Sequence, residues 1–154
     1  MNQTFEKFGK IGIASDHAGY SLKTHLAGRL KEWGYKVVDY GTDSSESVDY
    51  PDFGHSLANA IETKECTCGV AICYSGNGIG MVLNRHRGVR AALCWNKDIA
   101  GLARKHNDAN VCVLPGHFVT EKDAEDIVNL FLSSCFEGGR HLRRIEKINS
   151  GLQK

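Results

Sequence analysis

Short apolar runs alternate along the chain with segments whose apolar residues recur at helical spacing. Polar or glycine-containing turns stop each apolar run, which is typical of a buried strand. Leu22, Leu26 and Leu30 recur every four residues and predict an amphipathic helix with one buried face. The expected strands are residues 10–15, 36–40, 69–74, 89–94 and 110–114. The expected helices are residues 20–33, 53–63, 98–105, 121–135 and 140–151, with a shorter segment around 81–84.

Five alternations of strand and helix predict an α/β fold, a three-layer αβα sandwich with a five-stranded parallel sheet of Rossmann-like type. No linker or repeat interrupts residues 1–154, so we expect one domain, whose last helix (about 140–151) is free to pack on a neighbouring subunit. Ligands bind such sheets at the carboxyl ends of strands. His106 ends a helix, so we expect it at the opposite edge, from which it reaches that site only across a subunit boundary or through an unusual connection.

Composition narrows the classes of function. The 154 residues are 42% hydrophobic and 24% charged with a net charge of +1, which favours an ordinary soluble globular protein without attraction to nucleic acid or membrane. No apolar run predicts a transmembrane helix, and Met1–Lys10 lacks the apolar core of a signal peptide. Six cysteines without the spacing of a secreted scaffold favour a reducing cytoplasm. Cys66-x-Cys68 lacks a second ligand pair, so we expect no metal there.

One stretch combines a candidate base with a candidate anion site. A strand ends at Cys73, and Gly76, Gly78 and Gly80 follow, although not at dinucleotide-binding spacing. Such a loop brings several backbone N–H groups to one point, and the helix behind it favours a thiolate. The alternative is that Cys73 is a small hydrophobic residue of the core.

Three further patterns each allow two interpretations. Asp16-His17 follows the first strand and is either an acid/base and anion-contacting pair or a helix N-cap with a surface histidine. Arg140 and Arg144 stand four apart and suit a phosphate or a solvated basic face. Tyr50 is either an aromatic wall for a ligand or a loop anchor.

Seven motifs match one family in the same order along almost the whole chain. They are Ser15-Asp16-His17-Ala18-Gly19, Asp49-Tyr50-Pro51, Cys73 with its glycine loop, Asn84, Arg90-Ala91, Arg104-x-His106-Asn107-Asp108-x-Asn110-Val111 and Glu137-Gly138-Gly139-Arg140-His141-x-x-Arg144. Together they resemble type B ribose-5-phosphate isomerase, of the ribose/galactose isomerase family.

The resemblance implies an aldose–ketose isomerase that converts ribose 5-phosphate to ribulose 5-phosphate, a step of the pentose phosphate pathway, through an enediolate. It implies no metal or cofactor, and a homodimer with a shared active site, leaving a tetramer open. Cys73 matches the base, His106 the ring-opening histidine assisted by Asp16, and Ser75 a hydroxyl beside the base. The substrate-binding candidates are His17, Tyr50, Tyr74, Gly76, Asn77, Gly78, Asn107, His117, Arg140 and Arg144.

Departures from the family pattern leave the sugar open. Tyr74 and Asn77 add side chains where many members have glycine and isoleucine, and His117 stands where a phosphate-binding arginine is common. Ile79 occupies the place of a glutamate that serves a second, cysteine-free branch. The family also contains allose-6-phosphate and galactose-6-phosphate isomerases. A non-catalytic sugar-phosphate-binding module and a nucleotide-binding oxidoreductase are the alternatives from other classes.

Overall fold

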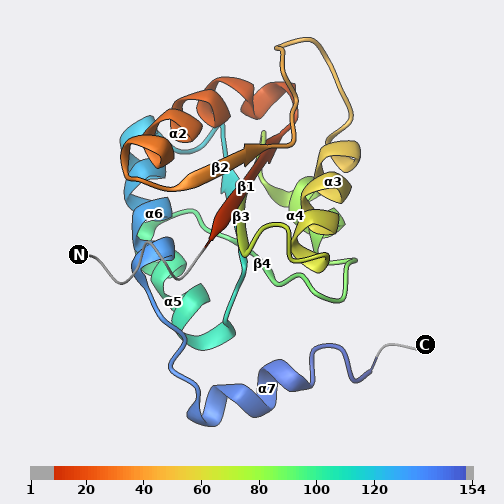
Figure 1. Ribbon diagram of the computed structural model, residues 1–154, viewed down its shortest axis with the longest axis vertical. Helices are drawn as coiled ribbons and strands as arrows, with labels where there is room; N and C mark the ends of the chain where they lie inside the picture. Colours follow the sequence, from red (N-terminus) through yellow and green to blue (C-terminus); the bar gives the residue numbers. More distant parts are fainter. Residues whose placement is uncertain (1–8, 152–154) are drawn as a thin grey trace.

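A parallel sheet lies between two layers of helices in the computed structural model, which describes residues 9–151 (Figure 1). The strands are β1 Lys10–Ser15, β2 Lys36–Asp39, β3 Cys68–Cys73, β4 Ala91–Leu93 and β5 Val111–Pro115. The helices are α2 Tyr20–Glu32, α3 Tyr50–Glu62, α4 Asn77–Leu83, α5 Lys97–Asn107, α6 Glu121–Ser133 and α7 Leu142–Glu146, with 3-10 turns η1 His17–Gly19 and η2 Gly139–His141. The α/β, three-layer prediction is confirmed. The signal-peptide expectation falls almost wholly on residues 1–8, which lie outside the described range.

The strand order is β2-β1-β3-β5-β4, with every pair parallel. From β1 the chain moves outward to β2 and then returns to place β3 on the other side of β1. The winding therefore changes direction between β1 and β3, whose ends are held in register by Ser15 opposite Ile72. Ligands of open α/β sheets bind in the crevice outside the carboxyl ends of strands at such a point.

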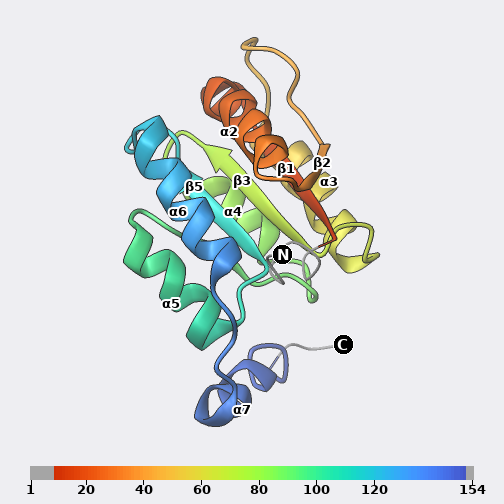
Figure 2. The same cartoon turned by 60° about the vertical axis from the view of Figure 1, so that its left-hand side comes forward.

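Each face of the sheet has its own apolar core. Helices α2, α5 and α6 cover one face, where they pack on Ile13, Ile72 and Leu114 (Figure 2). Helices α3 and α4 cover the other face and pack on Ala71 and Val113. The spacing of Leu22, Leu26 and Leu30 correctly predicted the buried side of α2. Within residues 9–151, no helix has the length and apolar content needed to cross a bilayer.

Two helices extend further than their sequence pattern indicated. The structure begins α3 at Tyr50 rather than Phe53, because Pro51 occupies the first turn, where its missing N–H has no helical partner to lose. Helix α5 includes His106 and Asn107, which lie beyond the end expected at residue 105, and the chain turns only at Asp108.

The predicted last helix, residues 140–151, is wrong in length. The segment begins with η2, and α7 ends at Glu146. No residue of α7 is buried, so it has no apolar face packed on the core. Most helical stability in proteins comes from such packing, and its absence explains the short helix.

Candidate active site

The loop between β3 and α4 folds tightly against neighbouring strands. Gly76 adopts a left-handed conformation with φ of 77°, and a Cβ there would lie 2.5 Å from Leu93 Cδ1. A Cβ on Gly78 would lie 2.6 Å from Cζ of Tyr50. The close approach at both positions, and the positive φ at Gly76, explain the glycines.

Backbone amides at the start of α4 are left without helical acceptors. The first helical bond runs from the Gly80 N–H to the Gly76 carbonyl at 3.1 Å. The Asn77 N–H donates to Ser75 Oγ at 3.3 Å, so that hydroxyl supports the loop. The N–H groups of Gly78 and Ile79 precede the first helical bond, as at any helix N-terminus, and are donors for an anion.

Cys73 is the last residue of β3 and lies directly before this loop. Its exposure is 4%, and it belongs to the core cluster that includes Ile79 and Val113. Its carbonyl accepts the Gly116 N–H at 2.9 Å, which ties the end of β3 to the chain leaving β5. Burial alone suits a core cysteine as well as a base. Its position beside the amide-rich loop is what distinguishes Cys73.

Asp16 and His17 occupy the neighbouring strand end. The Asp16 carboxylate accepts the Gly19 N–H at 3.1 Å, so its N-cap interpretation is confirmed, and its own N–H donates to Ile72 at 3.3 Å. His17 Nδ1 lies 3.1 Å from the backbone nitrogen of Val48 and 3.2 Å from its carbonyl oxygen. Asp16 is therefore held beside β3, and His17 is fastened to the loop before α3.

Aromatic rings border the same edge of the sheet. Tyr74 and His117 stack with centroids 4.3 Å apart and planes 13° apart, and Phe118 meets Tyr74 edge-on at 5.8 Å. Tyr74 is 52% exposed and Phe118 67%. With Tyr50 against Gly78, these rings form an exposed rim around the glycine loop.

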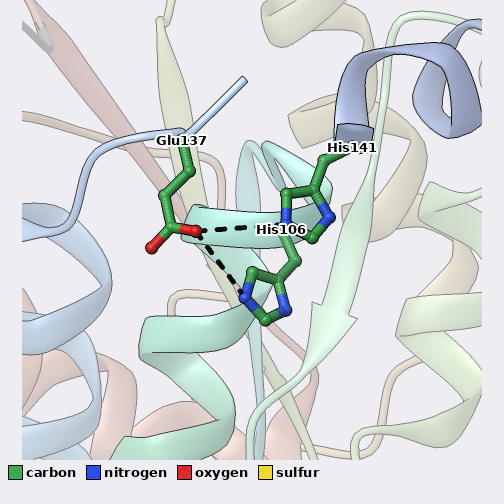
Figure 3. Close-up of side chains that lie close together, drawn as sticks. All are labelled: His106, Glu137 and His141. Atoms are coloured by element: carbon green, nitrogen blue, oxygen red, sulfur yellow. Dashed lines mark ion pairs between the residues drawn. The ribbon is translucent and has the colours of Figure 1, made fainter. Parts of the chain in front are cut away.

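His106 lies in a second cluster, at the end of α5. Its ring stacks on His141 with centroids 4.3 Å apart, and Glu137 Oε2 lies 3.9 Å from Nε2 of each histidine (Figure 3). Burial, together with the neighbouring His106 and Arg140 side chains, lowers the pKa of His141. The Glu137 N–H donates to the Lys105 carbonyl at 3.0 Å and so holds the cluster to α5.

The predicted arginine pair is divided between two elements. Arg140 lies in η2 and Arg144 in α7, so the single helical face expected for them is not formed. Arg144 lines a cavity of about 350 Å³ next to His106 and Asn107, and Arg140 does not line it. The lining residues are His106, Asn107, His141, Arg144, Ile145 and Ile148.

The two clusters lie at opposite edges of the sheet. In the register of β3 with β5, Cys73 faces Pro115 while Gly69 faces Val111, just after the turn that follows His106. From Gly69 to Cys73 is roughly 13 Å at about 3.3 Å per residue. Figure 2 shows α7 beyond the end of the sheet opposite the arrowhead of β3. Cys73, Asp16, His17 and the aromatic rim therefore share one edge, and His106, Asn107 and Arg144 share the other.

A family model described as Ribose/Galactose Isomerase matches residues 11–148, which include both clusters. The chain belongs to the ribose/galactose isomerase family.

Members of this family named ribose-5-phosphate isomerase B are similar over nearly their full length. The Escherichia coli protein of that name is 39% identical over 141 residues, covering 92% of this chain and 95% of that protein. A solved structure of the Clostridium thermocellum isomerase B is 48% identical with a TM-score of 0.91, covering 92% of this chain and 95% of that one. The Mycoplasma genitalium isomerase B, solved with bound ribulose-5-phosphate, is 42% identical with a TM-score of 0.86, covering 90% and 93%.

Two contacts in this ribose/galactose isomerase family member support the site and were not predicted. Asp108 has a backbone φ of 44°. Its carboxylate accepts hydrogen bonds from Arg90 at 3.0 Å and from Arg104 at 2.9 Å, which fixes the turn after His106. The Asn84 side chain exchanges two 2.9 Å hydrogen bonds with the backbone of Ala91, which holds β4 to α4. All five residues belong to the matched motifs, which gave no indication of these contacts.

Glu137 and His141 belong to the last of the matched motifs, and the sequence indicated no role for them. Their spacing of four residues signals side-chain proximity, and the structure places both against His106. These three side chains offer the one group of possible metal ligands found among residues 9–151.

Proposed function

We propose that this chain interconverts ribose 5-phosphate and ribulose 5-phosphate, with Cys73 as the base and an enediolate as the intermediate. The observation that carries the proposal is the position of Cys73, at the end of β3 and directly before the glycine loop, at the point where the winding changes direction. Family membership and the bound ribulose-5-phosphate in the Mycoplasma genitalium relative support the substrate class.

Isomerisation needs a base at the carbon that loses its proton and hydrogen-bond donors at the oxygen where negative charge develops. The Cys73 thiolate takes the proton from C2 of the open-chain aldose, and charge develops on the carbonyl oxygen at C1. The amides at the start of α4, together with Ser75, are placed to stabilise that oxygen. The same thiol returns the proton to C1, while the hydroxyl proton of the C2 oxygen passes to the C1 oxygen, so that the C2 oxygen becomes the carbonyl of the ketose.

The substrate must first be opened, because sugar phosphates are mostly cyclic. In the proposed site His106 and Asp16 move the protons of ring opening, and His17, Asn107, Tyr50, Tyr74, Asn77 and His117 contact the sugar. Arg144 and Arg140 bind the phosphate, which positions the reacting carbons from a distance.

One subunit alone does not bring these groups together, so we propose a homodimer in which His106 of one chain meets Cys73 of the other. A two-fold axis can bring the Cys73 edge of each chain against the His106 edge of the other, which builds two equal sites. Exposed apolar side chains that line one pocket with Gly76 support a second copy as the cover of this face: Met81 is 68% exposed and Leu93 36%. A tetramer of such dimers is compatible with this arrangement.

The proposed location is the cytoplasm, where thiols stay reduced. All six cysteines lie within the described residues and form no disulfide bond.

A comparison of substrates tests the proposed activity. Purified protein should isomerise ribose 5-phosphate with a higher kcat/KM than allose 6-phosphate or galactose 6-phosphate. A preference for a six-carbon substrate would reassign the reaction within the family. Tight binding of all three without turnover would indicate a non-catalytic sugar-phosphate-binding module.

A further inference from the structure

Glu137 and His141 have no role in the proposed isomerase reaction, yet both contact His106. One ligand atom of each residue lies within 4.8 Å of the other two, and both histidine Nε2 atoms lie 3.9 Å from Glu137 Oε2. Two imidazoles and one carboxylate are the protein ligands of zinc sites that keep an open coordination position. We propose that these three residues form a binding site for a divalent transition-metal ion such as Zn²⁺.

Side-chain rotation is needed to complete this site. Each ligand atom must move less than about 1 Å toward their common centre to reach a zinc bond of roughly 2.0–2.2 Å. The histidine rings are 11° from parallel, so one ring must also turn before both lone pairs converge. His106 and Glu137 have the freedom to move, with side chains 37% and 53% exposed, whereas His141 is 10% exposed and provides the fixed ligand.

The backbone holds the three ligands in place. The hydrogen bond from the Glu137 N–H to Lys105 joins the segment before η2 to the last turn of α5. The His141 N–H donates to the Gly138 carbonyl at 3.1 Å and closes the turn between Glu137 and His141. Most of the ordering that a metal site needs is therefore present in the folded chain.

A second set of two histidines and a glutamate has the same residue types but lacks the geometry of a metal site. His86 Nε2 lies 2.8 Å from His55 Nδ1, and His86 Nδ1 lies 2.9 Å from Glu62 Oε2. These contacts form a linear chain that occupies both nitrogens of the central ring, so its ligand atoms do not converge. This set has the same residue types and serves as the matched control.

Positive charge near the cluster limits the affinity. Arg144 lines the same cavity, and the charge of Arg140 acts on His141. A cation therefore binds here reversibly and more weakly than in a structural zinc site. The consequence rests on the proposed function: a metal on Nε2 of His106 removes the lone pair that accepts the proton in ring opening, and so inhibits the isomerase.

Calorimetric titration of the metal-free, full-length protein with ZnCl₂ tests the site. Wild type should bind one Zn²⁺ per chain in this site, and Glu137→Gln and His141→Gln should each weaken it on the order of 10-fold or more. The controls His55→Gln and Cys135→Ser should match wild type. Equal affinity in wild type and both cluster variants would overturn the proposal.

Activity separates this proposal from the proposed function. Zn²⁺ should inhibit wild type at concentrations that fill the site, and Glu137→Gln should need on the order of 10-fold more for the same fractional inhibition. Zinc binding with the expected variant pattern but without inhibition of wild type would uphold the metal site and contradict the role of His106.

Discussion

Gly76 lies under the backbone of Leu114: a Cβ on Gly76 would come 3.2 Å from the Leu114 carbonyl oxygen. This contact, with the positive φ of 77°, makes Gly76→Ala costly, and we expect a loss of unfolding free energy on the order of 1–3 kcal/mol. Gly80→Ala is the matched control. The nearest atoms to its Cβ would be the Val113 methyls at 3.8 Å, and alanine inside a helix is favoured by about 0.5–1 kcal/mol. Equal effects of the two substitutions in chemical denaturation would contradict the described loop.

Glu62 gives the stability of the fold a dependence on acid pH. A hydrogen bond with His86, and a second from the Gly88 N–H at 3.1 Å, lower its pKa from the ordinary 4.5. The carboxylate therefore stabilises the folded state above pH 4.5, and the contribution disappears as the pH falls through the lowered pKa. Denaturation at several pH values should show Glu62→Gln less stable than wild type at neutral pH and equal to it in acid. A difference that persists unchanged in acid would refute this assignment.

Features that depend on local spacing or turn geometry could be predicted from the sequence, whereas features that depend on packing could not. Leu22, Leu26 and Leu30 predicted α2 because helix packing requires that period, and Cys73 with its glycines predicted the loop because the turn requires glycine. The length of the last helix was wrong, because side-chain type does not reveal that α7 lacks a core to pack on.

The rest of the site depends on contacts between elements distant in sequence. Glu137 and His141 meet His106 only because the segment after α6 returns to the end of α5. The hydrogen bond from Arg90 to Asp108 likewise joins the segment before β4 to the turn after α5. Such contacts leave no periodic pattern, so residue spacing alone could not predict them.

Arg144 should bind phosphate more strongly than its neighbour on the chain. Both arginines are exposed, but Arg144 lines the cavity beside His106 and Arg143 does not. Hydrogen bonds to charged groups contribute about 1.5–3 kcal/mol, so Arg144→Ala should weaken binding of ribose 5-phosphate on the order of 10-fold or more. Binding of unphosphorylated ribose should scarcely change, and Arg143→Ala should resemble wild type for both ligands. If Arg144→Ala weakens both ligands equally, its role is structural.

The shared site predicts complementation between inactive subunits. Cys73→Ser and His106→Ala should each be inactive alone. After random subunit exchange about half the dimers are mixed, and each holds one intact site and one doubly altered site. Activity should return to about a quarter of wild type. Exchange demonstrated by mass spectrometry without recovered activity would place both residues in the site of one subunit, against the positions of the two sheet edges.

Proton exchange with solvent tests the role of Cys73 most directly. Cys73→Ser should fold and bind ribose 5-phosphate, yet lose incorporation of solvent deuterium at the carbon beside the carbonyl by roughly 10²–10⁴-fold, the usual contribution of a general base. Cys135→Ser removes an exposed thiol just after the C-terminal end of α6, and this variant should exchange at the wild-type rate. Near-wild-type exchange and turnover in Cys73→Ser would contradict the proposed mechanism.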